Sequence, residues 1–203
     1  MPTGKTGLKK DGKVDPMNPV IENIKARRSV RLFDGRKIDK KTLEALIDAA
    51  RWAPTGMNSQ PWRFVVAQGD EFRKKLSALA LPRYKKWLEK MPQELKAMRQ
   101  EVDEKTGDPA YYGAPVVVFV IGKGMTSDFD CAMACQNIML AARSLGIGSC
   151  WVYIGQLPLD DAEMRGALEL KEGEKVYGPL VLGYPKGNFP APPPKKDPPV
   201  KWL

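Results

Sequence analysis

Three arginines and a serine lie within five residues near the start of this 203-residue sequence: Arg27, Arg28, Ser29 and Arg31. Guanidinium groups suit phosphate oxygens because they donate paired hydrogen bonds and do not lose their charge. The segment therefore predicts a phosphate-binding site at the end of a short helix. A solvated basic turn would give the same pattern, and that alternative stays open for this motif alone.

A second candidate segment is the polar turn 53–62, which reads Ala-Pro-Thr-Gly-Met-Asn-Ser-Gln-Pro-Trp. It gathers small and amide-bearing residues, including Thr55, Gly56 and Asn58, where the backbone can approach a planar ligand. These are also ordinary turn residues, so a plain connection between a helix and a strand is the alternative.

Two further polar pairs stand out against their surroundings. Gln136 and Asn137 interrupt an apolar helical pattern, and buried amides need hydrogen-bond partners from a ligand or, more commonly, from neighbouring backbone. Lys195 and Lys196 lie among prolines near the C-terminus. This lysine pair is either a second phosphate clamp or a solubilising tail.

The sequence contains no histidine. Ser-His-Asp and Cys-His nucleophile systems, HExxH zinc sites and histidine-ligated haem are therefore excluded. If the protein is an enzyme, the difficult chemistry is expected to lie on a cofactor.

The cysteine and glycine patterns give no metal or nucleotide motif. Cys131, Cys135 and Cys150 are too few for a disulfide framework, and we expect all three to be buried as small apolar residues. The stretch Gly146–Trp151 is glycine-rich, but it lacks the GxGxxG order and precedes a strand. No Walker A motif occurs.

The net charge of +9 is concentrated at the two ends of the sequence. Residues 1–31 contribute +5 and residues 184–203 contribute +3, which leaves only +1 for the body between them. Nucleic-acid binders usually carry a basic stripe with exposed aromatic residues, which is not apparent here. A basic adaptor that binds acidic partners or nucleic acid through its two ends remains the non-enzymatic alternative.

The elements that must position these residues follow from hydrophobic periodicity. We expect helices over 19–27, from Asp39 to Pro54, over a charged region 70–105 interrupted at Pro82, over 128–145, and near 159–169. Strands are expected at 62–67, 115–121, 149–153 and 176–182.

The domain organisation is expected to be simple: a flexible basic arm over 1–18 and one domain over 19–203. The first residues lack the apolar region of a signal peptide, and no apolar run approaches the ~20 residues of a membrane span, so a cytoplasmic protein is the expectation.

Two features suggest a second subunit. The helix 128–145 is apolar nearly all round, and such a helix must be buried on every side. The proline-rich tail 184–203 has no helical or strand period and is long enough to reach across a neighbouring chain.

Taken in order, these segments resemble the nitroreductase family of FMN-dependent oxidoreductases. The resemblance covers about residues 19–198, and the RRSVRLF start with the NSQPW turn is its most specific part. The segments that carry it are 27–33, 53–62, 113–118, Gln136-Asn137 with Ala141-Ala142, 145–151, Gly183-Tyr184-Pro185 and Lys195-Lys196.

The resemblance implies an α+β fold with a central, mostly antiparallel sheet flanked by helices. It also implies an intertwined homodimer, with the tail crossing to the partner and FMN at the interface. The residues implied to hold FMN are Arg27, Arg28, Ser29 and Arg31 with Lys195 or Lys196 at the phosphate and ribityl chain, Pro54, Thr55, Gly56 and Asn58 at the ring, and Ile154 and Gly155 through their backbone near N5 of the ring.

The implied activity is hydride transfer from NADH or NADPH through the flavin to a nitroaromatic, quinone or similar acceptor by a ping-pong mechanism. No metal and no catalytic side chain are implied. Tyr84, Trp87, Met91, Tyr111 and Tyr112 are candidate lid residues over the substrate, with helix packing as the alternative for each. The same scaffold also resembles flavin enzymes that dehalogenate, dehydrogenate azoline rings or fragment their flavin.

Overall fold

The computed structural model describes residues 18–203, except for the side chains at positions 98, 101 and 102. The expected arm over 1–18 therefore lies, apart from Asn18, outside the described residues. The helices are α1 (Pro19–Ala26), α2 (Lys40–Arg51), α3 (Asp70–Glu89), α4 (Gln93–Thr106), α5 (Ser127–Ser144) and α6 (Ala162–Ala167), with 3-10 segments η1 (Gly56–Asn58) and η2 (Tyr153–Asp160). The strands are β1 (Trp62–Ala67), β2 (Val116–Gly122), β4 (Lys175–Gly183) and β3 (Gly148–Trp151).

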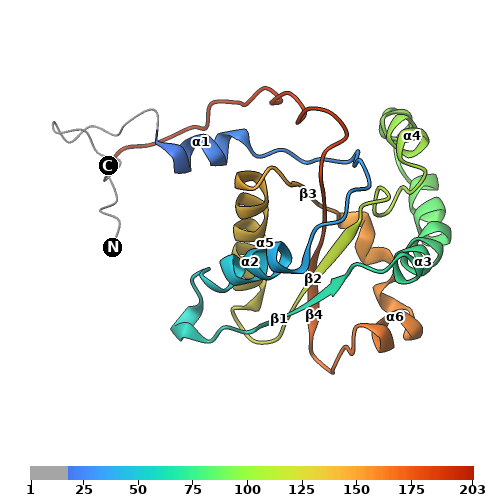
Figure 1. Cartoon of the computed structure of the whole chain (residues 1–203), viewed down its shortest axis with the longest axis horizontal. Helices are drawn as coiled ribbons and strands as arrows, with labels where there is room; N and C mark the ends of the chain where they lie inside the picture. The colour runs from blue at the N-terminus through green and yellow to red at the C-terminus, as the bar shows by residue number, and fades with distance from the viewer. Residues whose placement is uncertain (1–17) are drawn as a thin grey trace.

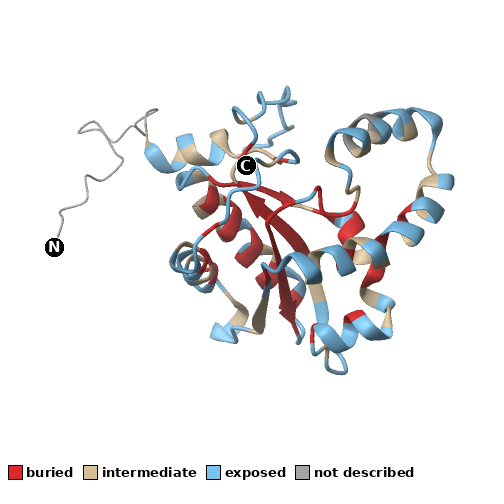
Figure 2. Cartoon of the chain, turned by 45° about the vertical axis from the view of Figure 1, so that its right-hand side comes forward, coloured by how far each residue is buried: buried red, intermediate tan, exposed pale blue. Residues whose placement is uncertain are grey.

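The four strands form one antiparallel sheet in the order β1-β2-β4-β3, with helices on both faces (Figure 1). This confirms the predicted α+β fold. Every residue of β2 is buried, as expected for a strand covered on both faces. Figure 2 shows the buried residues gathered in the sheet and on the sides of the helices that face it.

Alternate residues of β2 divide the core into two clusters, because successive side chains of a strand point to opposite faces. Val116, Val118 and Val120 pack with residues of α2 and α5. Val117, Phe119 and Ile121 pack with residues of α3, η2 and α6.

Helix α2 follows its sequence pattern closely. The Asp39 carboxylate accepts a hydrogen bond from the Thr42 backbone N–H at 2.9 Å, which satisfies one of the free donors at the helix start. Leu43, Leu46 and Ala50 recur at helical spacing and are buried. The predicted helix from Asp39 to Pro54 is therefore confirmed, with its last turn ending at Arg51.

The predicted interruption at Pro82 is wrong. Helix α3 continues through Pro82 to Glu89. The helical region is interrupted instead before Gln93, where α4 begins with Pro92 as its N-cap. Proline in a helix interior removes a backbone hydrogen bond, but Pro82 lies on the exposed side of α3. The Arg83 side chain also donates to the Leu79 carbonyl at 3.0 Å, next to the turn that the proline disrupts.

Two predicted boundaries after α5 also need correction. Strand β3 ends at Trp151, and residues 153–160 form the 3-10 segment η2 rather than the end of a strand. The helix expected near 159–169 is only the six-residue α6. Its N-cap is Asp161, which accepts hydrogen bonds from the backbone of Glu163 and Met164.

Helix α5 packs in the core on one side only. Its inward residues, including Cys135 and Ile138, are fully buried, whereas Phe129 is 71% exposed and Met133 is 36% exposed. Burial on every side is therefore not achieved within one chain. Phe129 and Met133, four positions apart, form an exposed apolar stripe on α5.

The tail is tied to the body only at its start. The Tyr184 carbonyl accepts a hydrogen bond from the Asp34 N–H, and the Lys186 N–H donates to the Leu32 carbonyl. The Arg143 guanidinium lies 4.3 Å from the centre of the Phe189 ring. Residues 190–203 are exposed and form no helix or strand, and they run back along the α1 side of the molecule (Figure 1). No helix among residues 18–203 is long and apolar enough to cross a membrane.

Candidate functional site

The arginine segment is fixed to one edge of the sheet. The Val30 backbone N–H donates to the Ser149 carbonyl at 3.0 Å, and Ser29 pairs with Ser149 as an isolated parallel bridge beside β3. The Val30 side chain is buried against Gly148, where an added Cβ would lie 2.7 Å from the Val30 Cβ. A buried Val30 in extended backbone directs Arg31 to the other side, where it is exposed.

The arginines of this segment lack acidic partners. Within residues 18–203, Arg27, Arg28 and Arg31 form no ion pair, whereas six other arginines each pair with a carboxylate. The Arg28 Nη1 donates to the carbonyls of Lys25 and Arg27, but its Nε is buried without a partner among the described residues. A buried donor left unpaired is costly, and Arg73 Nε is in the same state elsewhere among the described residues.

The nearby arginines also act on the pKa of the buried Cys150 thiol. Burial raises the pKa of Cys150, and the positive charges of Arg31, Arg27 and Arg99 act in the opposite direction. Three guanidinium groups from two parts of the chain therefore create a positive field around this end of β3.

A cavity of about 280 Å³ opens beside Ser29 and Arg31. Its walls come from three parts of the chain, namely the arginine segment, the end of α4 and the start of the tail. Three of its lining residues are cationic and none is acidic. The lining residues are Ser29, Val30, Arg31, Leu32, Lys105, Thr106, Lys186, Asn188 and Pro190.

The polar turn has an unusual backbone held by local bonds. Met57, Asn58 and Gln60 have positive φ values of 51°, 55° and 45°, which non-glycine residues rarely adopt. The Gln60 backbone N–H donates to Thr55 Oγ1 at 3.3 Å, and the Gln60 side chain donates to Asn58 Oδ1 at 3.1 Å. Such strain persists only where surrounding structure imposes it and is often found at ligand sites.

The residues of this turn that the resemblance assigns to the flavin ring lie at or near the surface. Pro54 and Asn58 are exposed, and Thr55 and Gly56 are half-buried. Gly56 lies against Thr126, where an added Cβ would come within 3.0 Å of Thr126 Cγ2. The turn thus presents its polar edge outward while Thr126 supports its back.

One chain does not bring the two segments together. The turn leads into β1 and the arginine segment lies beside β3, and these are the opposite edges of the sheet. Figure 1 shows them well separated, with the turn below α2 and residues 27–31 above β3. Lys195 and Lys196 are exposed in the tail.

Ile154 and Gly155, which are expected near the flavin ring, are packed inside the chain, and the backbone groups of Gly155 have partners there. Both residues are buried in η2. The Gly155 N–H donates to the Val152 carbonyl at 3.1 Å, and the Gly155 carbonyl accepts the Tyr111 hydroxyl at 2.9 Å. An added Cβ at Gly155 would meet Pro179 at 2.6 Å, so close packing accounts for the glycine.

The candidate lid residues are mostly packing residues. Tyr84, Tyr111 and Tyr112 are buried in the second core cluster, which is the packing alternative considered for them. Trp87 is half-buried, with its ring centre 5.9 Å from that of Tyr84, and Met91 is also half-buried.

The remaining candidates have structural explanations. The Asn137 side chain donates to the Ala49 carbonyl at 3.1 Å, and Gln136 is exposed. Cys131, Cys135 and Cys150 are free and buried, as predicted. Burial raises the pKa of all three thiols, so they are unreactive at neutral pH. Among the described residues, no group of three or more Cys, Asp or Glu side chains is arranged to hold a metal.

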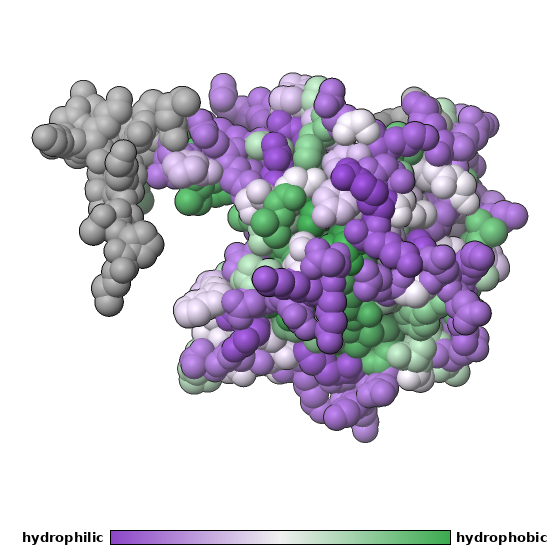
Figure 3. Space-filling view, in the orientation of Figure 1, coloured by the Kyte–Doolittle hydropathy of each residue, from purple (hydrophilic) through white to green (hydrophobic). Residues whose placement is uncertain are grey.

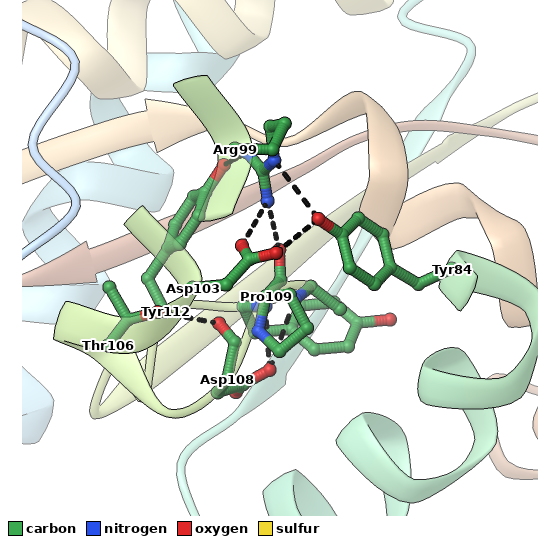
Figure 4. Close-up of polar contacts among 9 residues, drawn as sticks. Tyr84, Arg99, Asp103, Thr106, Asp108, Pro109 and Tyr112 are labelled. Atoms are coloured by element: carbon green, nitrogen blue, oxygen red, sulfur yellow. Dashed lines mark hydrogen bonds and ion pairs between the residues drawn. The ribbon is translucent and has the colours of Figure 1, made fainter. Parts of the chain in front are cut away.

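Sequence reasoning missed the role of α4 at this site. Lys105 and Thr106 line the cavity, and Arg99 anchors the helix through the contacts in Figure 4. The only sequence signal was the i, i+4 spacing of Arg99 and Asp103 in a strongly charged helix. That spacing is common on solvated helix faces, so it did not distinguish this pair.

Comparison with known proteins identifies the family of this chain. Residues 24–184 match the model of the nitroreductase family. A nitroreductase from Bacteroides fragilis, solved with bound FMN, is 33% identical with a TM-score of 0.74, covering 92% of this chain and 100% of that one. A protein of Methanothermobacter thermautotrophicus with the proposed name NADH dehydrogenase/NAD(P)H nitroreductase is 31% identical, over 88% of this chain and 83% of its own.

A third relative shows that the family is chemically diverse. The 5,6-dimethylbenzimidazole synthase of Rhodospirillum rubrum is 30% identical, and the match covers 82% of this chain and 82% of that protein. The family match spans most of the chain and includes both the arginine segment and the polar turn. This chain belongs to the nitroreductase family.

Proposed function

We propose that this protein is an FMN-dependent oxidoreductase that takes electrons from NADH or NADPH. One observation carries the proposal. Three guanidinium groups at positions 27, 28 and 31 have no acidic partner within residues 18–203, in a family whose solved relative from Bacteroides fragilis holds FMN. A phosphate-bearing cofactor supplies the missing acceptor.

The residues present fit FMN. Arg27, Arg28 and Ser29 offer charged and neutral donors for the phosphate, including the unpaired Nε of Arg28. Arg31 lies on the cavity side of the segment and suits the ribityl chain. Lys195 or Lys196 would close on the phosphate from the exposed tail.

A second copy of the chain completes the site in this proposal. Pro54, Thr55, Gly56 and Asn58 lie at the opposite sheet edge from the arginines, so they would contact a cofactor bound by the partner's arginine segment. The exposed apolar residues Phe129 and Met133 on α5 are suited to the dimer interface. Apolar surface also gathers in the centre of the face seen in Figure 3.

The dimer has a direct test. Replacing Phe129 and Met133 together by aspartate places charges on the α5 stripe, and sedimentation should then detect monomers with lost FMN binding. Leu81→Asp, which places the same charge on an exposed apolar residue of α3, serves as the control and should leave the dimer intact. A wild-type protein that sediments as a monomer with FMN bound would contradict the composite site.

Bound FMN supplies the redox chemistry, because flavins accept a hydride from nicotinamides and pass electrons to acceptors. The chain contributes binding, orientation and electrostatics, which require no histidine. Cationic residues around the cavity favour the anionic cofactor and stabilise negative charge that develops near it.

The proposed reaction is tested by steady-state kinetics. NADH or NADPH is varied at several fixed concentrations of a quinone or nitroaromatic acceptor. If both substrates use one site in turn, double-reciprocal plots are parallel. Intersecting lines would contradict the ping-pong part of the proposal, and absence of turnover with all acceptors would contradict reductase activity.

A further inference from the structure

Arg99 is the centre of a polar cluster that joins α4 to the body of the protein (Figure 4). Its Nη1 donates to the Tyr112 hydroxyl at 3.1 Å, and its Nη2 donates to Asp103 Oδ1 at 3.0 Å and to the Pro109 carbonyl at 2.8 Å. Its Nε points to the Tyr84 hydroxyl at 3.4 Å, and that hydroxyl also bonds with Asp103. Arg99 therefore contacts α3, α4 and the loop before β2.

The loop that receives Arg99 is itself fixed. The Asp108 carboxylate accepts hydrogen bonds from the backbone N–H groups of Ala110, Tyr111 and Gly113. It also accepts the Ser77 hydroxyl of α3 at 2.8 Å. The Pro109 carbonyl and the Tyr112 ring are thus fixed points to which Arg99 attaches.

The described side chains of α4 are mostly polar and lie near the surface. None of its described side chains is buried, and Leu95 is 45% exposed. Helices of globular proteins gain most of their stability by packing an apolar face. Among the described side chains of α4, those of Arg99, Asp103 and Thr106 make polar contacts that tie the helix to the body.

The same cluster adjoins the candidate cofactor cavity. The Arg99 and Arg31 guanidinium carbons lie 5.7 Å and 5.8 Å from the centre of the Tyr112 ring. At the other end of α4, Lys105 and Thr106 line the cavity with Ser29 and Arg31. A displacement of α4 would consequently open one wall of the cavity and remove the support of Tyr112 beside Arg31.

From this arrangement we infer that Arg99 is a positioning residue for cofactor binding. It holds α4 in place as one wall of the cavity beside Ser29 and Arg31. The inference rests on the proposed function for the identity of the ligand. It assigns Arg99 no contact with FMN and no part in the redox step. Its removal should weaken FMN binding and increase the mobility of α4 together.

Arg83, on α3, provides a matched control because it is also a partly buried arginine that joins two parts of the chain. It pairs with Asp161 at 3.1 Å and donates to the Leu79 carbonyl, so it ties α3 to the region of α6. It makes no contact with Tyr112 or Arg31. A loss of general stability affects both variants, whereas a loss of cofactor positioning is expected for Arg99 alone.

The test compares the wild-type chain with Arg99→Ala, Arg99→Lys and Arg83→Ala. Hydrogen exchange is measured over residues 93–106 in the FMN-free protein, and FMN affinity is measured by quenching of flavin fluorescence. Arg99→Ala should exchange faster over 93–106 and raise the dissociation constant for FMN about tenfold. Arg99→Lys keeps the charge but not the fork of donors, so its effect should be intermediate.

Arg83→Ala should leave both FMN affinity and exchange over 93–106 unchanged. Tyr112→Phe, which removes only the hydroxyl acceptor, supplies a milder variant and should weaken FMN binding about threefold. Unchanged FMN affinity in Arg99→Ala and Tyr112→Phe, or equal losses in Arg83→Ala, would overturn the inference. If the wild-type chain binds no FMN, the proposed function fails, while the exchange data alone still test the attachment of α4.

Discussion

Arg63 and Arg31 are both surface-reaching arginines, but their guanidinium groups have very different surroundings. Arg63 donates to both carboxylate oxygens of Glu174, at 2.9 Å and 2.6 Å, and to the carbonyls of Leu168 and Glu169. Arg31 forms no ion pair within residues 18–203 and faces a cavity with no acidic lining. An arginine whose donors are used stabilises the fold, whereas one with free donors is available to a ligand.

The largest effect is expected for Arg27→Ala, which removes an arginine of the unpaired group. It deletes a charge-assisted contact to phosphate worth roughly 1.5–3 kcal/mol, so FMN affinity should fall about tenfold to a hundredfold. Titration of the apo-protein with FMN measures the change, and the free energy of unfolding should be close to that of wild type. An FMN affinity equal to that of wild type would show that Arg27 is a surface residue with no part in FMN binding.

Arg63→Ala should show the reverse pattern. Loss of the paired contacts leaves Glu174 and two carbonyls without their donor, which should lower the free energy of unfolding by about 1–3 kcal/mol. FMN affinity of the folded protein should not change. Denaturant titration and FMN titration of one preparation measure both quantities. A strong loss of FMN affinity would contradict the distinction between paired arginines, which stabilise the fold, and unpaired arginines, which bind the ligand.

The Arg63–Glu174 pair should also be visible in the pH dependence of stability. Hydrogen bonds from Arg63 lower the pKa of Glu174 from 4.5 to about 2, outweighing burial, which acts in the opposite direction. Because the folded-state pKa is depressed, the contribution is present above pH 4.5 and is lost as the pH falls towards 2.

Glu174→Gln is the matching variant for this pH effect. It cannot ionise, so the stability difference between wild type and variant should shrink as the pH falls through this range. Unfolding midpoints at several pH values measure the difference. A difference that stays constant down to pH 2 would argue against the ion pair as its source.

The smallest effect is expected at an exposed pair. Arg51 and Asp48 lie 3.1 Å apart on α2, with side chains 64% and 58% exposed. Water screens such pairs, so Arg51→Ala should change the free energy of unfolding by less than about 0.5 kcal/mol. Thermal unfolding of Arg51→Ala and Arg63→Ala compares the two variants. Equal losses of stability would show that ion pairing itself, rather than burial and multiple hydrogen bonds, determines the contribution of each arginine.

Local signals predicted most of the secondary structure. The strand Trp62–Ala67 and the Asp39 cap of α2 follow from alternation and capping, which depend on a few neighbouring residues. The passage of α3 through Pro82 was not predictable in this way. It depends on which side of the helix faces solvent, and that is decided by the packing of Ala80 and Tyr84 on the sheet.

The candidate site was predictable as segments but not as an arrangement. The arginine motif and the polar turn are visible in sequence, but their places at opposite sheet edges follow from strand order, which is a long-range property. The partners of Arg99 come from residues 84–112, and no local pattern shows that Pro109 and Tyr112 accept from it. Likewise, Tyr111 reaches Gly155 across 44 positions of the chain.

The central claim is that the unpaired arginines hold a redox-active flavin, and the most direct measurement is the visible spectrum of the purified protein. After reconstitution with FMN and removal of free cofactor, the flavin bands should remain with the wild-type chain. They should bleach when NADH or NADPH is added without oxygen. A colourless protein that takes up no FMN, or a bound flavin that neither nicotinamide reduces, would contradict the account.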